Sequence, residues 1–207
     1  MLKLLDLFCG AGGCSVGFQR AGFSVTGVDI AAQPHYPLEF HQADALEFVK
    51  KYAHSFDVIA ASPPCQAYTH AQRIQKNSHP DLVADTRAAL IATGKPWIME
   101  NVSGAPLYRA VTLCGASFKL RTYRHRLFES SVDLAAPKHQ PHLFRLNKMG
   151  RRPKPNEYMH VVGNFIGIEE ARAAMGISWM TRDELREAVP PAYTEFLGRQ
   201  IIDAIQT

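Results

Sequence analysis

A cysteine follows two prolines in DVIAASPPCQAY, residues 57–68, where a short apolar run ends. Proline fixes the backbone φ angle, so Pro63 and Pro64 hold Cys65 on a stiff turn after an expected strand. A nucleophilic cysteine needs such a fixed, partly exposed position and help in forming its thiolate, so Cys65 is the candidate nucleophile. A free cysteine is more often a small buried hydrophobic residue. We interpret the remaining three in that way: Cys9, Cys14 and Cys114.

A second unusual residue is Glu100, which ends the otherwise apolar run KPWIMENV, residues 95–102. Glutamates are seldom buried without a partner, and burial raises the pKa of a carboxyl group. A structural explanation would be a salt bridge with Arg124 or Arg126. The functional explanation is a carboxyl group that donates a proton or hydrogen bond to a heterocycle. Both explanations are open at the level of sequence.

A glycine-rich turn follows the first apolar run in DLFCGAGGCSVGF, residues 6–18. Gly10 and Gly12 allow a tight turn in which backbone amides approach a ligand before a helix begins. Asp29 ends the second apolar run, where an acidic side chain can accept hydrogen bonds from both hydroxyls of a ribose. Ser15 stands at the third glycine position of the dinucleotide fingerprint, so the pattern is compatible with a nucleoside-type ligand without requiring one.

Elements that can position these residues alternate along the first half of the chain. The expected strands are 2–8, 24–30, 56–62 and 95–102, and the expected helices are 13–21, 44–53 and 81–94. Asp44 and Asp81 are suitable N-caps, and Gly22 and Gly94 stand where helices should stop. Asp44 could alternatively accept a hydrogen bond from an adenine amino group. Strands alternating with helices predict a layered α/β fold with parallel pairing, in which ligands bind beyond the carboxyl ends of the strands.

The second half of the chain has a different pattern. Two more strands are expected, at 112–118 and 124–131, before a stretch rich in Pro, Lys, Arg and His at 136–158 that is typical of a loop or small subdomain. Helical patterns return at 169–176, 181–189 and 190–205. Thr181 with Glu184 three residues later is a capping-box signature.

Composition limits the class of protein. The 207 residues are 46% hydrophobic and 20% charged, as in a soluble globular domain rather than a disordered chain. No apolar run approaches the length of a membrane span, and the N-terminus reads as a first strand rather than a signal peptide. The four cysteines have no framework spacing, which indicates a reducing, cytoplasmic location. A net charge of +4 is compatible with nucleic acid but decides nothing alone.

Several short motifs together resemble one family. DLFCGAGG, SPPCQ, ENV, the Arg-x-Arg of RHRLF and AVPP occur in the order found in DNA (cytosine-5) methyltransferases, from Leu5 to about Ile205. The C-terminal part is most similar to the compact bacteriophage-encoded members. The resemblance implies a Rossmann-like S-adenosylmethionine-dependent methyltransferase sandwich with a reduced target-recognition region. It implies a catalytic and cofactor-binding core at 1–130, a reduced recognition region at 131–180 and a C-terminal helical segment at 181–207.

The resemblance also implies the roles of the catalytic residues. Cys65 would attack C6 of a cytosine as a thiolate, and Glu100 would protonate or hydrogen-bond N3. Arg126 would hold the carbonyl oxygen of the base, and Arg124 would orient Glu100 or contact the phosphate backbone. The cofactor would be S-adenosylmethionine, and the residues expected to line it are Phe8, Gly10, Gly12, Asp29, Ile30, Asp44 and Pro64.

The implied partner is double-stranded DNA. A cytosine inside a duplex hides C6, so such an enzyme must flip the base out of the stack. Gln66, Arg73 and Lys76 would lie on a loop that closes on DNA. Arg151 and Arg152 lie in a basic stretch with Lys148 and Lys154 that could contact phosphates, although charge clusters are more often solvated faces.

The chain departs from the family pattern at three places. Thr122 stands where a Gln usually precedes the Arg-x-Arg pair, and Glu187 where the last motif usually has Asn. Only about 60 residues separate RHRLF from AVPP. Since a short recognition surface reads few base edges, we expect low sequence specificity or a very short site.

Other interpretations concern metals and substrates. His139, His142 and His160 lack the paired spacing of zinc ligands, so we interpret them as DNA-facing or structural and expect no metal. The same thiolate chemistry could act on RNA or on a free cytosine nucleotide, and an inactive DNA-binding homologue is a further alternative. A monomer is the default expectation.

Overall fold

The computed structural model describes residues 1–68 and 81–207. Its centre is a seven-stranded sheet with the order β3-β2-β1-β4-β5-β7-β6. The strands are β1 (Lys3–Leu7), β2 (Ser24–Asp29), β3 (Glu39–Gln42), β4 (Val58–Ala61), β5 (Trp97–Asn101), β6 (Val111–Leu113) and β7 (Arg126–Ser130). The first five run parallel, whereas β7 is antiparallel to both β5 and β6. The expected α/β fold is confirmed, with an antiparallel hairpin added at one edge.

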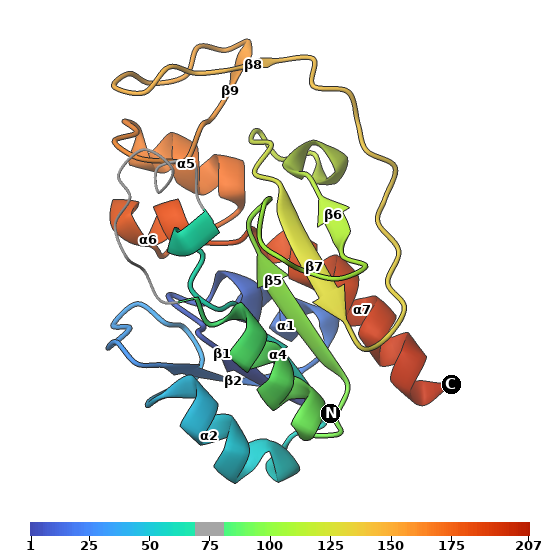
Figure 1. The fold of residues 1–207 in the computed structure, drawn as a ribbon. Coiled ribbons are helices and arrows are strands. Elements are labelled where there is room, and N and C mark those ends of the chain that lie inside the picture. The colour runs from blue at the N-terminus through green and yellow to red at the C-terminus, as the bar shows by residue number, and fades with distance from the viewer. Residues whose placement is uncertain (69–80) are drawn as a thin grey trace.

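Alternation along the strands divides the core into two layers. Leu4 of β1 packs with α1 (Gly13–Ala21) and α7 (Pro191–Gln206), while Leu5 and Leu7 pack with α2 (Ala45–Tyr52) and α4 (Val83–Ala92). Successive side chains of a strand point to opposite faces, so a parallel strand buried on both faces is predominantly apolar. Figure 1 shows the sheet between these helix pairs.

A third apolar cluster lies at the carboxyl edge of the parallel strands. It joins Met159, Val161 and Phe165 to α5 (Ile168–Met175) and α6 (Arg182–Glu187), and it includes Ala11 from the glycine turn after β1. In Figure 1, α5, α6 and the short strands β8 (Arg145–Leu146) and β9 (Glu157–Tyr158) lie together above the sheet. The second half of the chain therefore covers the edge at which ligands bind in such folds.

Helix ends follow the expected caps with one shift. Asp44 accepts from the amide of Glu47, and Thr181 and Glu184 form the capping box. Gly22 ends α1 in the left-handed region at φ 117°. Asp81 accepts from the amide of Val83, but the residue preceding α4 is Leu82, so the expected N-cap is wrong by one position.

One expected strand is also too long, and one observed strand was not expected. The strand expected at 112–118 ends at Leu113, because Gly115–Phe118 form a 3-10 helix, η3. A Cβ on Gly115 would lie 2.1 Å from the carbonyl oxygen of Thr122, so the chain turns tightly here. The edge strand β3 was not expected. No helix of the described part of the chain is long and apolar enough to cross a bilayer.

Candidate active site

The turn that carries Cys65 is held by two neighbouring strands. The amide of Ser62 donates to the carbonyl of Leu7 on β1 over 3.0 Å. The side-chain amide of Asn101, at the end of β5, donates to the carbonyl of Pro63, also over 3.0 Å. Asn101 is fully buried, and Cys65 is half-buried. The two prolines are thus fixed on both sides of the strand end, and the thiol extends beyond it.

Glu100 and Arg126 meet because β7 runs antiparallel to β5. The start of β7 therefore lies beside the carboxyl end of β5, with Glu100 opposite Phe128 and Asn101 opposite Leu127. Nε of Arg126 lies 2.9 Å from Oε1 of Glu100, and both side chains are about nine-tenths buried. The contact has ion-pair distance but not hydrogen-bond geometry, so this buried Oε1 has no hydrogen-bond partner among the described residues. A carboxyl group is held at the strand end with an unfilled acceptor position.

The charges in this group act on one another. Burial raises the pKa of Glu100, and Arg126 and then Arg124 oppose that rise. The pKa of the Cys65 thiol is also raised, mainly by burial and next by the negative charge of Glu100, while Arg126 lowers it. Without a substrate, the cysteine is therefore stabilised as the neutral thiol, and thiolate formation needs a change in this environment.

Beyond β1, the glycine turn and Asp29 form a second group. The amide of Gly10 donates to Oδ2 of Asp29, and the amide of Ala31 donates to Oδ1. Phe8 and Gly10 both have positive φ angles, 56° and 49°, which fold the backbone back over the end of the strand. Ile30 is 71% exposed beside Asp29. A carboxylate and an apolar side chain thus lie together at the carboxyl edge of β2.

Two other expected cofactor residues lie near this edge. Asp44 caps α2 through Oδ1, so the helix-capping interpretation of this residue is confirmed. Pro64 is half-buried next to Cys65. The structure places Asp29 at the last position of β2 and the other six expected cofactor residues in segments that follow β1, β2, β3 or β4.

Arg124 has a different environment from the expected one. Its Nε, Nη1 and Nη2 donate to the carbonyl oxygens of Ala188, Val161 and Arg186 over 2.6–2.8 Å. Three of the five guanidinium N–H groups are thus engaged by backbone carbonyls. Arg124 fastens the C-terminal segments to the start of β7, so its direct contact is with the scaffold rather than with the reacting groups.

The expected nucleic-acid residues have varied environments. Arg151 forms a two-bond pair with Glu157, at 2.6 and 2.7 Å, so its charge is largely matched within the chain. Arg152 is 73% exposed on its side chain and lies 3.2 Å from Glu170. Gln66 is exposed at the start of the 3-10 helix Gln66–Tyr68. Arg73 and Lys76 lie outside the described residues.

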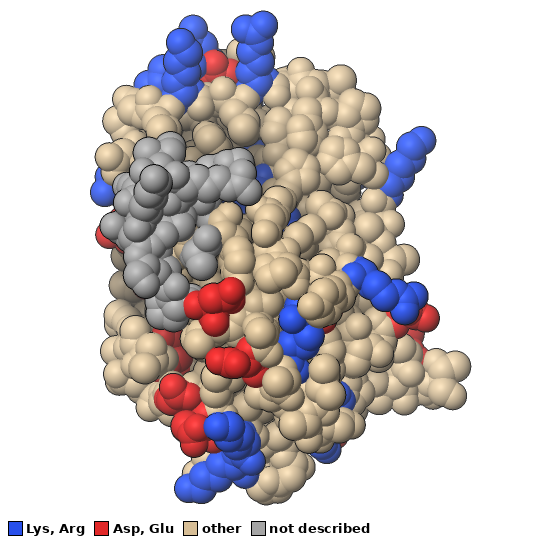
Figure 2. Space-filling view, in the orientation of Figure 1, with Lys and Arg blue, Asp and Glu red and all other residues tan. Residues whose placement is uncertain are grey.

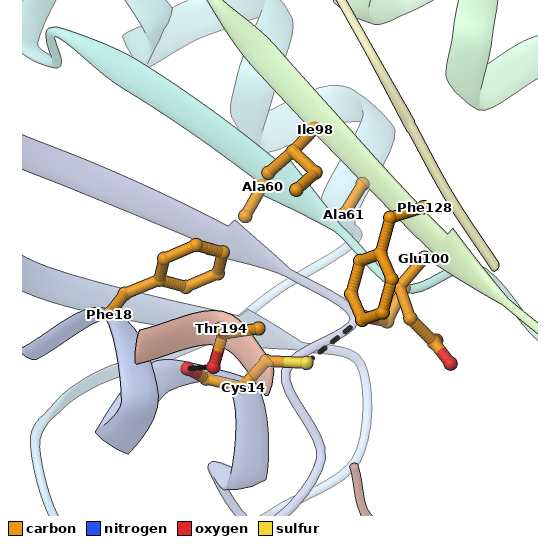
Figure 3. Close-up of a pocket in the computed structure, with 9 residues that line it drawn as sticks. Cys14, Phe18, Ala60, Ala61, Ile98, Glu100, Phe128 and Thr194 are labelled. Carbon is orange, nitrogen blue, oxygen red and sulfur yellow. Dashed lines mark hydrogen bonds between the residues drawn. The ribbon is translucent and has the colours of Figure 1, made fainter. Parts of the chain in front are cut away.

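A small cavity lies behind Glu100, between the sheet and the helices α1 and α7. Figure 3 shows Phe18, Cys14 and Thr194 on one side of it and Phe128 and Ile98 on the other. Its volume is about 10 Å³, room for one water molecule at most, so neither a base nor a cofactor can bind there. The reacting groups instead lie at the outer edge, where Cys65 stands.

Some residues near the site were not assigned a role from sequence. Asn101 belongs to the ENV motif, but its bond to the carbonyl of Pro63 joins strands far apart in sequence and has no local signal. Glu187 is exposed at the end of α6, and its charge raises the pKa of Cys65. Thr122 is buried.

The histidines named from the sequence lie in two places. His139 and His142 lie together with Cys114 and His125, whereas His160 is not part of that group.

Comparison with known proteins gives the family. Residues 2–107 match the family model of C-5 cytosine-specific DNA methylase. The chain is 35% identical over 120 residues to the Type II methyltransferase M.HgiDI of Herpetosiphon aurantiacus, covering 51% of this chain and 38% of that protein. It is 34% identical over 121 residues to M.HgiGI of the same organism, covering 51% and 94%. The chain thus matches well under half the length of M.HgiDI.

Solved structures agree on the fold. A prophage-encoded protein of E. coli assigned as a DNA modification methyltransferase has a TM-score of 0.70 at 15% identity, with 100% of both chains covered. The S. pombe Dnmt2 methyltransferase has a TM-score of 0.65 at 14% identity, covering 100% of this chain and 99% of that one. These structures show the fold alone, whereas the match of residues 2–107 to the family model shows that the chain belongs to the C-5 cytosine-specific DNA methylase family.

Proposed function

We propose that this protein transfers a methyl group from S-adenosylmethionine to C5 of cytosine in double-stranded DNA. The observation that carries this proposal is the meeting of Cys65, Glu100 and Arg126 at adjacent ends of β4, β5 and β7. A nucleophile, a buried carboxyl group and a cation together match what addition to a pyrimidine ring requires. Family membership supports the same chemistry.

In the proposed mechanism, the Cys65 thiolate adds to C6 of the flipped base. Glu100 protonates or hydrogen-bonds N3, so that the ring accepts the electron pair of the new bond. Its raised pKa favours the protonated form that this role needs. Arg126 holds the carbonyl oxygen of the base. C5 then becomes nucleophilic and would take the methyl group that bound S-adenosylmethionine supplies. Loss of the C5 proton afterwards expels the thiolate and restores the aromatic ring.

The carboxyl edge of β1 and β2 fits the cofactor. Asp29 has both carboxylate oxygens oriented by backbone amides, and each oxygen can still accept from a ribose hydroxyl. Nothing lies within 4 Å of the position of a Cβ on Gly10, so a ligand can approach the backbone there. Phe8, Ile30 and Pro64 offer apolar surface for a purine. When bound, S-adenosylmethionine supplies an electrophilic methyl group.

DNA contacts are proposed for the surface above the carboxyl edge. Figure 2 shows basic side chains projecting at the top of the molecule, above β8 and β9. Lys148, Arg152 and Lys154 are exposed in this region, and Arg152 and Gln66 are the best-placed described candidates.

We also propose a division of the chain into a core at 1–130, a reduced recognition region at 131–180 and a C-terminal segment at 181–207. We further propose that the protein is a cytoplasmic monomer of bacteriophage or bacterial origin.

A competition assay tests the substrate. Purified protein with radiolabelled S-adenosylmethionine is offered equal amounts of duplex DNA, transfer RNA and deoxycytidine monophosphate, with Glu100→Gln as the inactive control. We expect label in the DNA alone, at C5 of cytosine. Label in RNA or in the mononucleotide would show that this molecule, rather than DNA, is the substrate. No label in any of them, with cofactor binding intact, would identify an inactive homologue.

A further inference from the structure

Four potential metal ligands meet at the loop end of the β6–β7 hairpin, where Cys114 follows β6 and His125 precedes β7. In that hairpin Leu113 pairs with Arg126, so the next residues outward, Cys114 and His125, lie side by side. His139 and His142 come from the chain that runs from β7 to β8, which is the long segment at the right of Figure 1. The four ligand atoms all lie within 4.8 Å of one another.

Their spacing matches a tetrahedral site. Nε2 of His125 and Nε2 of His139 are 3.1 Å apart, and Sγ of Cys114 is 3.4 Å from Nε2 of His142. For Zn²⁺ with ordinary bond lengths, the edges of the tetrahedron are about 3.3 Å between nitrogens and about 3.6 Å between nitrogen and sulfur. Both observed distances are close to these values.

The surroundings also suit a metal rather than a set of free side chains. The three imidazole rings lie 5.0–5.4 Å apart, so protonating them would place like charges together. His142 stacks on Tyr123 at 3.6 Å, and the Tyr123 hydroxyl bonds both the amide and the carbonyl of Phe144. The segment bearing these ligands is therefore already held in place.

We propose that Cys114, His125, His139 and His142 bind one Zn²⁺ ion that fastens the β7–β8 connection to the β6–β7 hairpin. Four protein ligands close the tetrahedron, which makes the site structural rather than catalytic. Residues 131–143 form no helix or strand, so they have little regular structure of their own to hold them. The carbonyl of His125 accepts from Nη1 of Arg126, which links the ion to the residue that pairs with Glu100. The expectation of no metal missed this site, because its ligands come from separate segments.

Metal analysis of the untagged full chain tests the proposal. After expression with added Zn²⁺ and desalting, we expect about one zinc per chain, falling to about a tenth or less in Cys114→Ser and in His142→Ala. His54→Ala is the matched control, since His54 is exposed and lies outside the group; it should keep the zinc of the wild type. Zinc well below stoichiometric in a folded wild type, or equal zinc in all variants, would overturn the proposal.

A second measurement covers variants that fail to fold. Co²⁺ added to the metal-free wild-type chain should give the visible bands of a tetrahedral site and a thiolate-to-cobalt band in the ultraviolet. Zn²⁺ should displace both and raise the Tm of the same sample, because an ion that binds only the folded state stabilises it. An octahedral cobalt spectrum without the thiolate band would contradict the assignment. Neither readout depends on methyl transfer.

Discussion

At the scale of single residues, the groups of the site change one another's pKa values. Burial and the charge of Glu100 keep Cys65 a thiol, whereas Arg126 favours its thiolate. Burial also keeps the pKa of Glu100 high. A base whose N3 accepts a hydrogen bond from protonated Glu100 would favour that neutral form of the carboxyl group, and so would remove a negative influence from the cysteine. Substrate binding and nucleophile activation are thus coupled through one carboxyl group.

Glu187 provides a test of this electrostatic account. Glu187→Gln removes a negative charge that raises the pKa of Cys65, so more thiolate forms at a given pH. Alkylation by iodoacetamide should be about two- to threefold faster near neutral pH, and its rise with pH should move to lower pH. The other three cysteines are buried, so the assay reports mainly Cys65.

Asp183→Asn is the control for that measurement, because Asp183 is an exposed acid on the same helix and is not among the charges acting on Cys65. Equal rates for the wild type and Glu187→Gln would show that Glu187 does not influence the thiol.

Asn101 provides a test of how the cysteine is positioned. Asn101→Ala leaves the carbonyl of buried Pro63 without its donor, which costs about 1–3 kcal/mol of unfolding free energy. Urea unfolding measures that loss, and methyl transfer should fall more than cofactor affinity. Asn156→Ala, at an exposed asparagine, should change neither. Full activity in Asn101→Ala would mean that the two prolines position Cys65 without help from β5.

At the scale of elements, α1 and α7 approach each other closely because glycines, which have no side chain, lie where the two helices meet. A Cβ on Gly17 would lie 1.9 Å from Oγ1 of Thr194 and 2.2 Å from the carbonyl of Pro191. Thr194 in turn donates to the carbonyl of Cys14. The C-terminal helix thereby supports the helix that follows the glycine turn.

Gly17→Ala should therefore destabilise the fold, although alanine is the better helix former. We expect a loss of about 1–3 kcal/mol or more in unfolding free energy, measured by urea denaturation, because the two helices must move apart. Arg20→Ala, at an exposed position of α1, should lose less than about 0.5 kcal/mol. A neutral or stabilising Gly17→Ala would show that α1 and α7 pack more loosely than described.

Most of the parallel half of the fold could be predicted from the sequence, because four of its five strands are mostly apolar and glycines or caps bound its helices. β3 could not, since Glu39–Gln42 is a largely exposed, polar edge strand without an apolar run. The early end of β6 depends on the close approach of Gly115 to Thr122, which sequence does not show. Antiparallel β7 likewise has no signature of direction, yet it brings Arg126 to Glu100.

At the scale of the whole molecule, motif residues could be predicted but their partners could not. Cys65, Glu100 and Asp29 stand at strand ends, where the fold makes position informative. The engagement of Arg124 with three carbonyls and the grouping of His125 with His139 depend on contacts between distant segments. Such contacts leave no local pattern along the chain.

The small region between β7 and α6 leads to a prediction about specificity. Few elements above the carboxyl edge are available to read base edges, and Arg151 is already paired with Glu157. Sequencing the methylated positions in a pool of randomised duplexes should yield a very short or degenerate site. A strict site of about six or more base pairs would contradict this prediction.

The central claim is that Cys65 attacks a cytosine in DNA, and covalent trapping tests it most directly. Duplex DNA containing 5-fluorocytosine is incubated with S-adenosylmethionine and either the wild type or Cys65→Ala, then resolved on a denaturing gel. Fluorine at C5 blocks the final elimination, so the account predicts a protein–DNA band for the wild type and none for Cys65→Ala. A folded, cofactor-binding wild type that gives no band, or a band that persists in Cys65→Ala, would contradict it.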